Sequence, residues 1–183
     1  MEKNRRPMQR TEDESVIVGR NPVMELLKSG RDVEKLYIQK GEREGSITKI
    51  FAEAKKRGIV ISEVDKKRLD EISFGNAHQG VAAVASSVEY KTVEEIVLSA
   101  REKGEAPLIV VCDGVEDPHN LGAIIRCAEC CGAHGLVIPK RRAAGLTPLV
   151  TKASAGAIEH LAIAKVSNIT NTIEQLKKEG VPL

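Results

Sequence analysis

Aromatic residues are nearly absent from this sequence of 183 residues, which contains two Phe, two Tyr and no Trp. Proteins that recognise RNA bases commonly stack them on aromatic rings. We therefore expect any RNA contact of this chain to depend on cationic and backbone groups. Apolar runs are short, since none approaches the roughly 20 residues of a membrane-spanning helix and no signal-like apolar segment follows the basic start. These absences predict a cytoplasmic protein with no membrane partner.

Net charge and cysteine content are also low. The 28 basic and 26 acidic residues leave a net charge of +2, which does not by itself indicate a nucleic-acid partner. The cysteines are Cys112, Cys127, Cys130 and Cys131. The Cys127-x-x-Cys130 spacing is compatible with a zinc or redox site, but no second Cys or His pair stands at ligand spacing. We expect no metal site, and interpret the cysteines as small core residues of a protein from a reducing compartment.

The chain is long enough for one large domain or two small ones. Residues 1–14 mix basic and acidic side chains with almost no apolar ones, which predicts a disordered tail. Residues 15–86 alternate short apolar runs with helical patterns and are predicted to form a small three-layer α/β domain. Residues 87–105 are predicted to be a linker helix, and residues 106–183 a second domain built on a parallel sheet.

Polar residues mark the expected starts of several helices. Asn21, followed by Pro22, is predicted to cap the first helix. Asp65 is predicted to cap a short helix that runs to Ile72, and Thr92 to cap the linker helix.

The stretch from Leu108 to Arg126 is the centre of the functional interpretation. An apolar run through Cys112 predicts a buried strand, and an acidic loop with Pro and Gly follows it. Asn120 is predicted to cap the next helix, and Arg126 to project near the edge of its buried face. This arrangement predicts a pocket at the carboxyl edge of a parallel sheet. The same pattern is also typical of an ordinary strand–loop–helix joint with a solvated arginine.

A second basic segment follows the next predicted strand, residues 135–139. Its end carries Lys140, Arg141 and Arg142, which we interpret as a phosphate clamp beside the Asn120 loop; a solvated turn is the alternative. A helix over residues 147–157 is predicted to contain Lys152. Its small residues suit close packing against a strand or against another subunit.

Three segments resemble a known family. The run Asp113-Gly-Val-Glu-Asp-Pro-His-Asn-Leu-Gly-Ala-Ile-Ile-Arg126, with residues 138–142 and 152–159, resembles the first signature region of the SpoU (TrmH-type) RNA 2'-O-methyltransferases, and more narrowly the RlmB-like ribosomal RNA guanosine methyltransferases. Residues 15–86 resemble the small RNA substrate-binding domain of those enzymes, on the segments 19–23 and 78–80.

The resemblance implies an α/β protein with an N-terminal RNA-binding domain and a SPOUT-type, trefoil-knot methyltransferase domain. It implies transfer of a methyl group from S-adenosylmethionine to a ribose 2'-hydroxyl, in a guanosine of large-subunit ribosomal RNA, by a homodimer. Arg126 is the implied catalytic residue, with Asn120 shaping the loop that faces the ribose. The residues that we expect to contact RNA are Lys140, Arg141, Arg142, Lys152, Arg20 and His78.

The sequence also departs from the family. The glycine-glutamate-glycine loop and the segment that closes the knot, which form most of the donor pocket, have no counterpart in these 183 residues. We therefore expect the chain to end before the knot, assign no cofactor-binding residue, and expect the 183 residues alone to bind the donor poorly and to be inactive. Two other functions remain open, a non-catalytic RNA-binding module and an antibiotic-resistance ribosomal RNA 2'-O-methyltransferase. A nucleotide-binding enzyme is disfavoured because no glycine-rich phosphate loop follows a strand.

Overall fold

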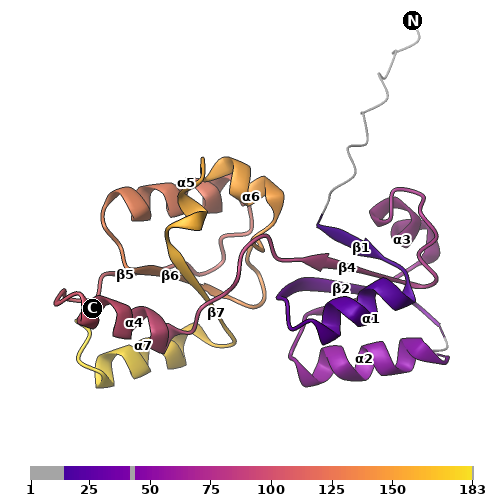
Figure 1. Cartoon of the computed structure of the whole chain (residues 1–183), viewed down its shortest axis with the longest axis horizontal. Coiled ribbons are helices and arrows are strands. Elements are labelled where there is room, and N and C mark those ends of the chain that lie inside the picture. The colour runs from indigo at the N-terminus through magenta and orange to yellow at the C-terminus, as the bar shows by residue number, and fades with distance from the viewer. Residues whose placement is uncertain (1–14, 42–43, 183) are drawn as a thin grey trace, which may run out of the picture.

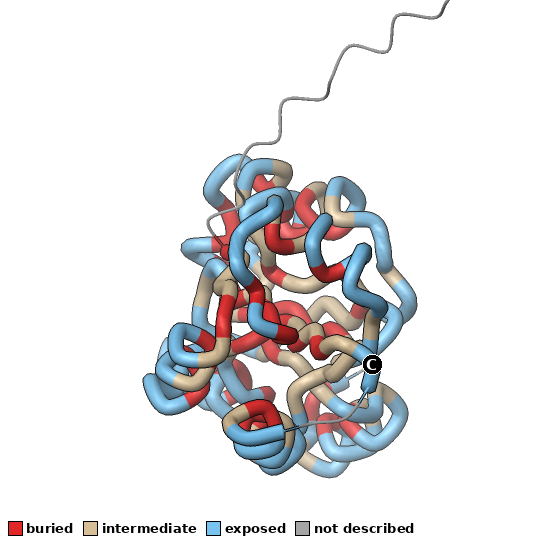
Figure 2. Tube along the Cα trace, turned by 90° about the vertical axis from the view of Figure 1, so that its right-hand side faces the viewer, coloured by how far each residue is buried: buried red, intermediate tan, exposed pale blue. Residues whose placement is uncertain are grey.

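The computed structural model describes residues 15–41 and 44–182, which form two α/β units connected by one segment (Figure 1). The tail predicted for residues 1–14 lies outside the described residues. Exposed residues cover the outer turns of the helices, and buried residues lie toward the inside of the molecule (Figure 2). No helix in the described ranges is both long enough and apolar enough to cross a membrane.

The N-terminal unit is a mixed four-stranded sheet with helices on both sides. Its elements are β1 (Val16–Val18), α1 (Arg20–Lys28), β2 (Val33–Gln39), α2 (Ser46–Lys56), β3 (Ile61–Val64), α3 (Lys66–Ile72) and β4 (Val81–Ala85). The strand order is β1-β4-β2-β3, in which only β2 and β3 run parallel. Alternate residues such as Leu36 and Ile38 join the core formed with α1 and α2, whereas α3 lies on the other side of the sheet (Figure 1).

The C-terminal unit is built on a parallel sheet, as predicted, and helices cover both faces of that sheet. Its elements are α4 (Val93–Glu102), β5 (Ile109–Val111), α5 (Pro118–Cys130), β6 (Gly135–Pro139), α6 (Pro148–Ala153), a 3-10 turn (Ala157–Glu159), β7 (Ala162–Val166) and α7 (Ile169–Lys178). The strands follow the order β5-β6-β7. One apolar cluster joins α5 and the 157–161 segment to the sheet, and a second joins α4 and α7 to its other face. The predicted linker helix, α4, is therefore packed into this unit.

Two helix starts differ from the prediction. Asp117, and not Asn120, caps α5, because its side chain accepts the backbone N–H of Asn120 at 2.9 Å and Pro118 occupies the first helical position. Likewise α1 begins at Arg20, one residue after Gly19, so Asn21 is inside the helix and is not its cap. Gly19 has φ of 97°, a conformation that favours glycine. The caps predicted at Asp65 and Thr92 are confirmed.

Further differences concern the cysteines and the helix predicted over residues 147–157. Cys112 is buried, but the other three cysteines are exposed, and Cys127 and Cys131 line an open apolar hollow beside Val110 of the edge strand β5. The prediction of core cysteines is therefore wrong for these three. The helix stops at Ala153, since Ala155 and Gly156 both adopt positive φ. Ala153 packs against Gly122 within the same unit.

Candidate functional site

The loops after β5 and β6 lie together at the carboxyl edge of the parallel sheet. The backbone N–H of Ala144 donates to the carbonyl oxygen of Val115 at 2.8 Å, which joins the two loops directly. Parallel strands bring their carboxyl ends to one edge, where ligands of such sheets commonly bind. This is the edge to which the sequence assigned the Asn120 loop and the basic segment.

Asn120 lies at a hollow of about 450 Å³ beside the first of these loops. The other lining residues are Gly114, Val115, Glu116, Ala123 and Ile124. Asn120, Ala123 and Ile124 are spaced as one face of α5, so this face forms one wall of the hollow. Asn120 is an exposed residue, although its backbone N–H donates to Asp117.

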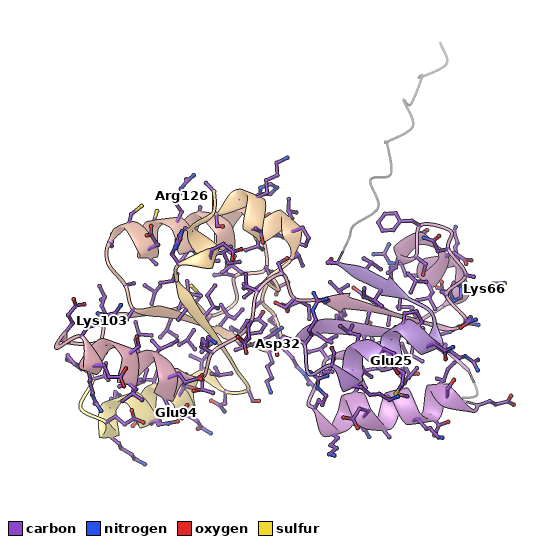
Figure 3. The ribbon with its side chains drawn as sticks, in the orientation of Figure 1. Glu25, Asp32, Lys66, Glu94, Lys103 and Arg126 are labelled. Carbon is purple, nitrogen blue, oxygen red and sulfur yellow. The ribbon has the colours of Figure 1, made fainter. Side chains whose placement is uncertain are left out.

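Arg126 lies on a different side of α5 and points outward (Figure 3). It follows Asn120 by six residues, which at about 100° per residue turns it well away from the face that lines the hollow. The prediction that Arg126 lies at the edge of the buried face is wrong, because the residue is exposed, whereas Ile125 and Ala128 supply the buried side. Within the described part of the chain, no acidic side chain pairs with its guanidinium.

The basic segment lines a separate hollow of about 320 Å³ between the two units. Lys140, Arg141 and Arg142 form one side, and Lys35 and Tyr37 of β2 belong to the other. This hollow shares no lining residue with the one beside Asn120. The structure thus brings the basic segment to the N-terminal unit, in a hollow that neither Asn120 nor Arg126 lines.

Two of the other predicted contact residues hold a loop of the N-terminal unit in place. Nδ1 of the buried His78 accepts the N–H of Gly80 at 2.9 Å, so Nε2 carries the proton and donates to Asp70 at 2.9 Å. The Nε of Arg20 donates to the carbonyl oxygen of Gln79 at 3.0 Å. Lys152 is exposed at the end of α6. Contacts of these residues with RNA stay predictions.

A buried polar cluster between the units was missed by sequence reasoning. Glu34 of β2 accepts the hydroxyl of Tyr90 at 2.7 Å and the backbone N–H of Leu146 at 3.0 Å, and it pairs with Lys165 of β7. The ammonium of Lys165 is 4.9 Å from the centre of the Tyr90 ring. We call Glu34, Tyr90 and Lys165 the interdomain cluster. The alternation of the strand gave no signal for it, because a register irregularity between Val33 and Lys35 places Val33 in the core and turns Glu34 toward the other unit.

Burial changes the chemistry of this cluster. Removal from water, followed by the neighbouring Glu34 carboxylate, raises the pKa of Tyr90 far above its ordinary value. Tyr90 therefore remains a neutral donor to Glu34. Elsewhere in the described ranges, no group of three or more His, Cys, Asp or Glu side chains is placed to hold a metal ion.

Two family models match the chain in succession. Residues 16–91 match the RNA 2'-O ribose methyltransferase substrate binding model, and residues 107–183 match the SpoU rRNA Methylase family. The chain belongs to the SpoU family of RNA methyltransferases. The first match covers the sheet of the N-terminal unit, and the second covers the parallel sheet with the Asn120 loop, α5 and the basic segment.

Curated relatives support this membership of the SpoU family. The chain is 46% identical over 165 residues to YacO of Bacillus subtilis, a protein named as a TrmH family tRNA/rRNA methyltransferase, and covers 66% of its length. It is 42% identical over 169 residues to a Staphylococcus haemolyticus protein of the same family name, and covers 67% of it. These matches include 90% and 92% of the present chain. The chain thus spans about two-thirds of the relatives it matches.

Solved structures of SpoU-type enzymes are similar at a lower level. The AdoMet complex of the methyltransferase AviRb from Streptomyces viridochromogenes is 19% identical, with a TM-score of 0.43, and the match covers 90% of this chain and 58% of that one. An AdoMet-bound rRNA methyltransferase from Sinorhizobium meliloti is 23% identical, with a TM-score of 0.41, over 85% of this chain and 54% of that one.

Proposed function

We propose that this protein methylates RNA, using S-adenosylmethionine to modify a ribose 2'-hydroxyl in a guanosine of large-subunit ribosomal RNA, in the cytoplasm. The observation that carries the proposal is the pair of family matches in one chain, an RNA 2'-O ribose methyltransferase substrate-binding model followed by an rRNA methylase model. The structure supports it with two hollows at the carboxyl edge of a parallel sheet, one beside Asn120 and one lined by cations.

In the proposed reaction, Arg126 stabilises the negative charge that develops on the ribose oxygen. A ribose hydroxyl must lose its proton as it attacks the methyl carbon, so negative charge develops on its oxygen. A guanidinium is a fork of donors that can stabilise this oxygen and hold the adjacent phosphate. Arg126 is exposed and unpaired among the described residues, which leaves its donors available. Because it lies outside the Asn120 hollow, we propose that the ribose extends from that hollow over the outer side of α5.

The methyl donor does not fit the residues at hand. The polar side chains that line the hollow beside Asn120 are Glu116 and Asn120, both exposed, and none of the buried polar side chains reaches it, so the hollow lacks the enclosed polar partners that would hold a charged sulfonium nucleoside. We assign no donor-binding residue, and propose that these 183 residues by themselves bind RNA without methyl transfer and that the active protein is a homodimer.

The test is transfer of a tritiated methyl group from S-adenosylmethionine to ribosomal RNA by the full product of the gene. Arg126→Lys keeps the charge but loses the fork, and should lower the rate about a hundredfold. Arg31→Lys, at another exposed arginine, is the matched control and should leave the rate unchanged. Near-normal methylation by Arg126→Lys would remove the proposed role of Arg126. If labelling in the presence of the donor never exceeds background, the methyltransferase activity is excluded. The remaining function is then that of a non-catalytic RNA-binding module, which the hollow lined by cations favours.

A further inference from the structure

The basic hollow between the two units is a groove with walls from both of them. The N-terminal wall includes Lys35 and Tyr37 on β2, on the face of the sheet opposite the core of α1 and α2. The C-terminal wall is the segment after β6, with Lys140, Arg141 and Arg142. We call it the interdomain groove.

The charge of this groove is almost entirely positive. Its lining contains Lys35, Lys140, Arg141, Arg142 and Lys165, against one acid, Glu34. The carboxylate of Glu34 forms an ion pair with Lys165. The other four basic side chains of the groove are not neutralised by this acid. None of the four has an acidic partner among the residues that the structure describes. Unpaired cations that converge on a hollow form a site for an anion.

The two walls are held together by buried contacts. Glu34 accepts the N–H of Leu146, which lies four residues after Arg142, and pairs with Lys165 of the adjacent strand. The N–H of Ser87 donates to the carbonyl oxygen of Leu146 at 2.7 Å. A Cβ at Gly145 would lie 2.7 Å from the carboxyl carbon of Glu34, so glycine lets the loop between β6 and α6 approach the carboxylate. Since Glu34 and Lys35 are adjacent, the same contacts position Lys35 opposite the basic segment.

We propose that the interdomain groove binds the phosphodiester backbone of an RNA strand, with Lys35 from one domain and Lys140 and Arg141 from the other contacting its phosphates. This inference rests on the proposed function and adds a second RNA contact surface, separate from Arg126 and Asn120. Phosphate contacts position an RNA without reading its sequence, which suits a groove with cations and only one aromatic ring. The interdomain cluster, by holding the walls in register, sets the spacing of the contacted phosphates.

The experiment measures binding of a fluorescein-labelled, mixed-sequence single-stranded RNA of 16 nucleotides to the 183-residue chain, as a function of salt. The double variant Lys35→Ala with Lys140→Ala removes one cation from each wall. Lys66→Ala with Lys103→Ala removes the same charge from exposed positions at opposite ends of the molecule and is the control (Figure 3). Arg142 is left unchanged, because its φ of 57° lies in the left-handed region, where a replacement would change the conformational energy of the loop together with its charge.

For two lost phosphate contacts we expect the affinity at 0.1 M salt to fall about 20-fold and the slope of log affinity against log salt to decrease by about 1.4. The control should stay within about twofold of the parent chain. Equal losses in the two double variants would mean that only net charge matters, and would overturn the groove while RNA binding stands. A parent chain that fails to bind the RNA would overturn the groove and the RNA-binding part of the proposed function together.

Discussion

Glu34 and Lys165 form an ion pair between the two domains, with side chains that are only 5% and 14% exposed. Removing one partner of a buried pair leaves the other charge without compensation, which costs far more than the loss of a surface pair. We therefore expect Glu34→Ala to lower the free energy of unfolding by about 3–5 kcal/mol in urea denaturation.

The matched control for this prediction is Glu25→Ala, because Glu25 pairs with Lys28 at 2.9 Å with both side chains largely exposed. That variant should lose less than about 1 kcal/mol. Equal effects of the two alanine variants would show that the Glu34 pair contributes no more than a surface pair.

Tyr90 should make the stability depend on pH above about 10. In the unfolded chain this phenol loses its proton near its ordinary pKa of about 10, whereas burial and Glu34 raise the pKa in the folded chain. Above that pH the folded state therefore binds more protons, and the contribution of Tyr90 to stability, constant at lower pH, falls as the pH rises. We expect the difference in unfolding free energy between the parent and Tyr90→Phe to be flat from pH 8 to 9 and to shrink by up to about 1.4 kcal/mol per pH unit above 10. A difference that stays constant to pH 11 would contradict this account.

Gly122 allows α5 and α6 to cross closely. A Cβ at this position would lie 2.8 Å from the carbonyl carbon of Ala153 and 2.9 Å from the backbone nitrogen of Ser154. In an open helix, replacement of Gly by Ala would stabilise by about 1 kcal/mol, but here the collision should dominate and Gly122→Ala should destabilise by about 1–3 kcal/mol. Cys130→Ala, at an exposed position of the same helix, should change little. Stabilisation by Gly122→Ala in thermal unfolding would mean that the helices are not packed this closely.

The cap of α5 provides a test of the corrected helix start. Asp117→Ala removes the acceptor of the Asn120 N–H and should cost about 1 kcal/mol in urea denaturation. Asn120→Ala keeps that backbone N–H, removes only an exposed amide, and should cost much less. The reverse order of the two effects would restore Asn120 as the capping residue.

The order of strands and helices could be predicted because each element carries its own local signal. The apolar run with branched residues at 135–139 predicted β6 with the bounds that the structure has. The side-chain acceptors Asp65 and Thr92 predicted the starts of α3 and α4. The signature around α5 likewise located the family, since the residues of that motif are close in sequence. Local errors arose where two polar residues compete for one role, as Asp117 and Asn120 do for the cap of α5.

By itself the sequence thus determined the class of fold, the family and the loops at the carboxyl edge of the sheet. Only the tertiary structure decided which candidate residues share a surface. It separated Arg126 from the Asn120 hollow, because the rotation of α5 depends on which face packs against the sheet. It brought Lys35 to the basic segment and buried Glu34 against Lys165 and Tyr90, although these residues lie far apart in the chain. Contacts of this kind leave no periodic pattern, since they depend on how two separately folded sheets pack against each other.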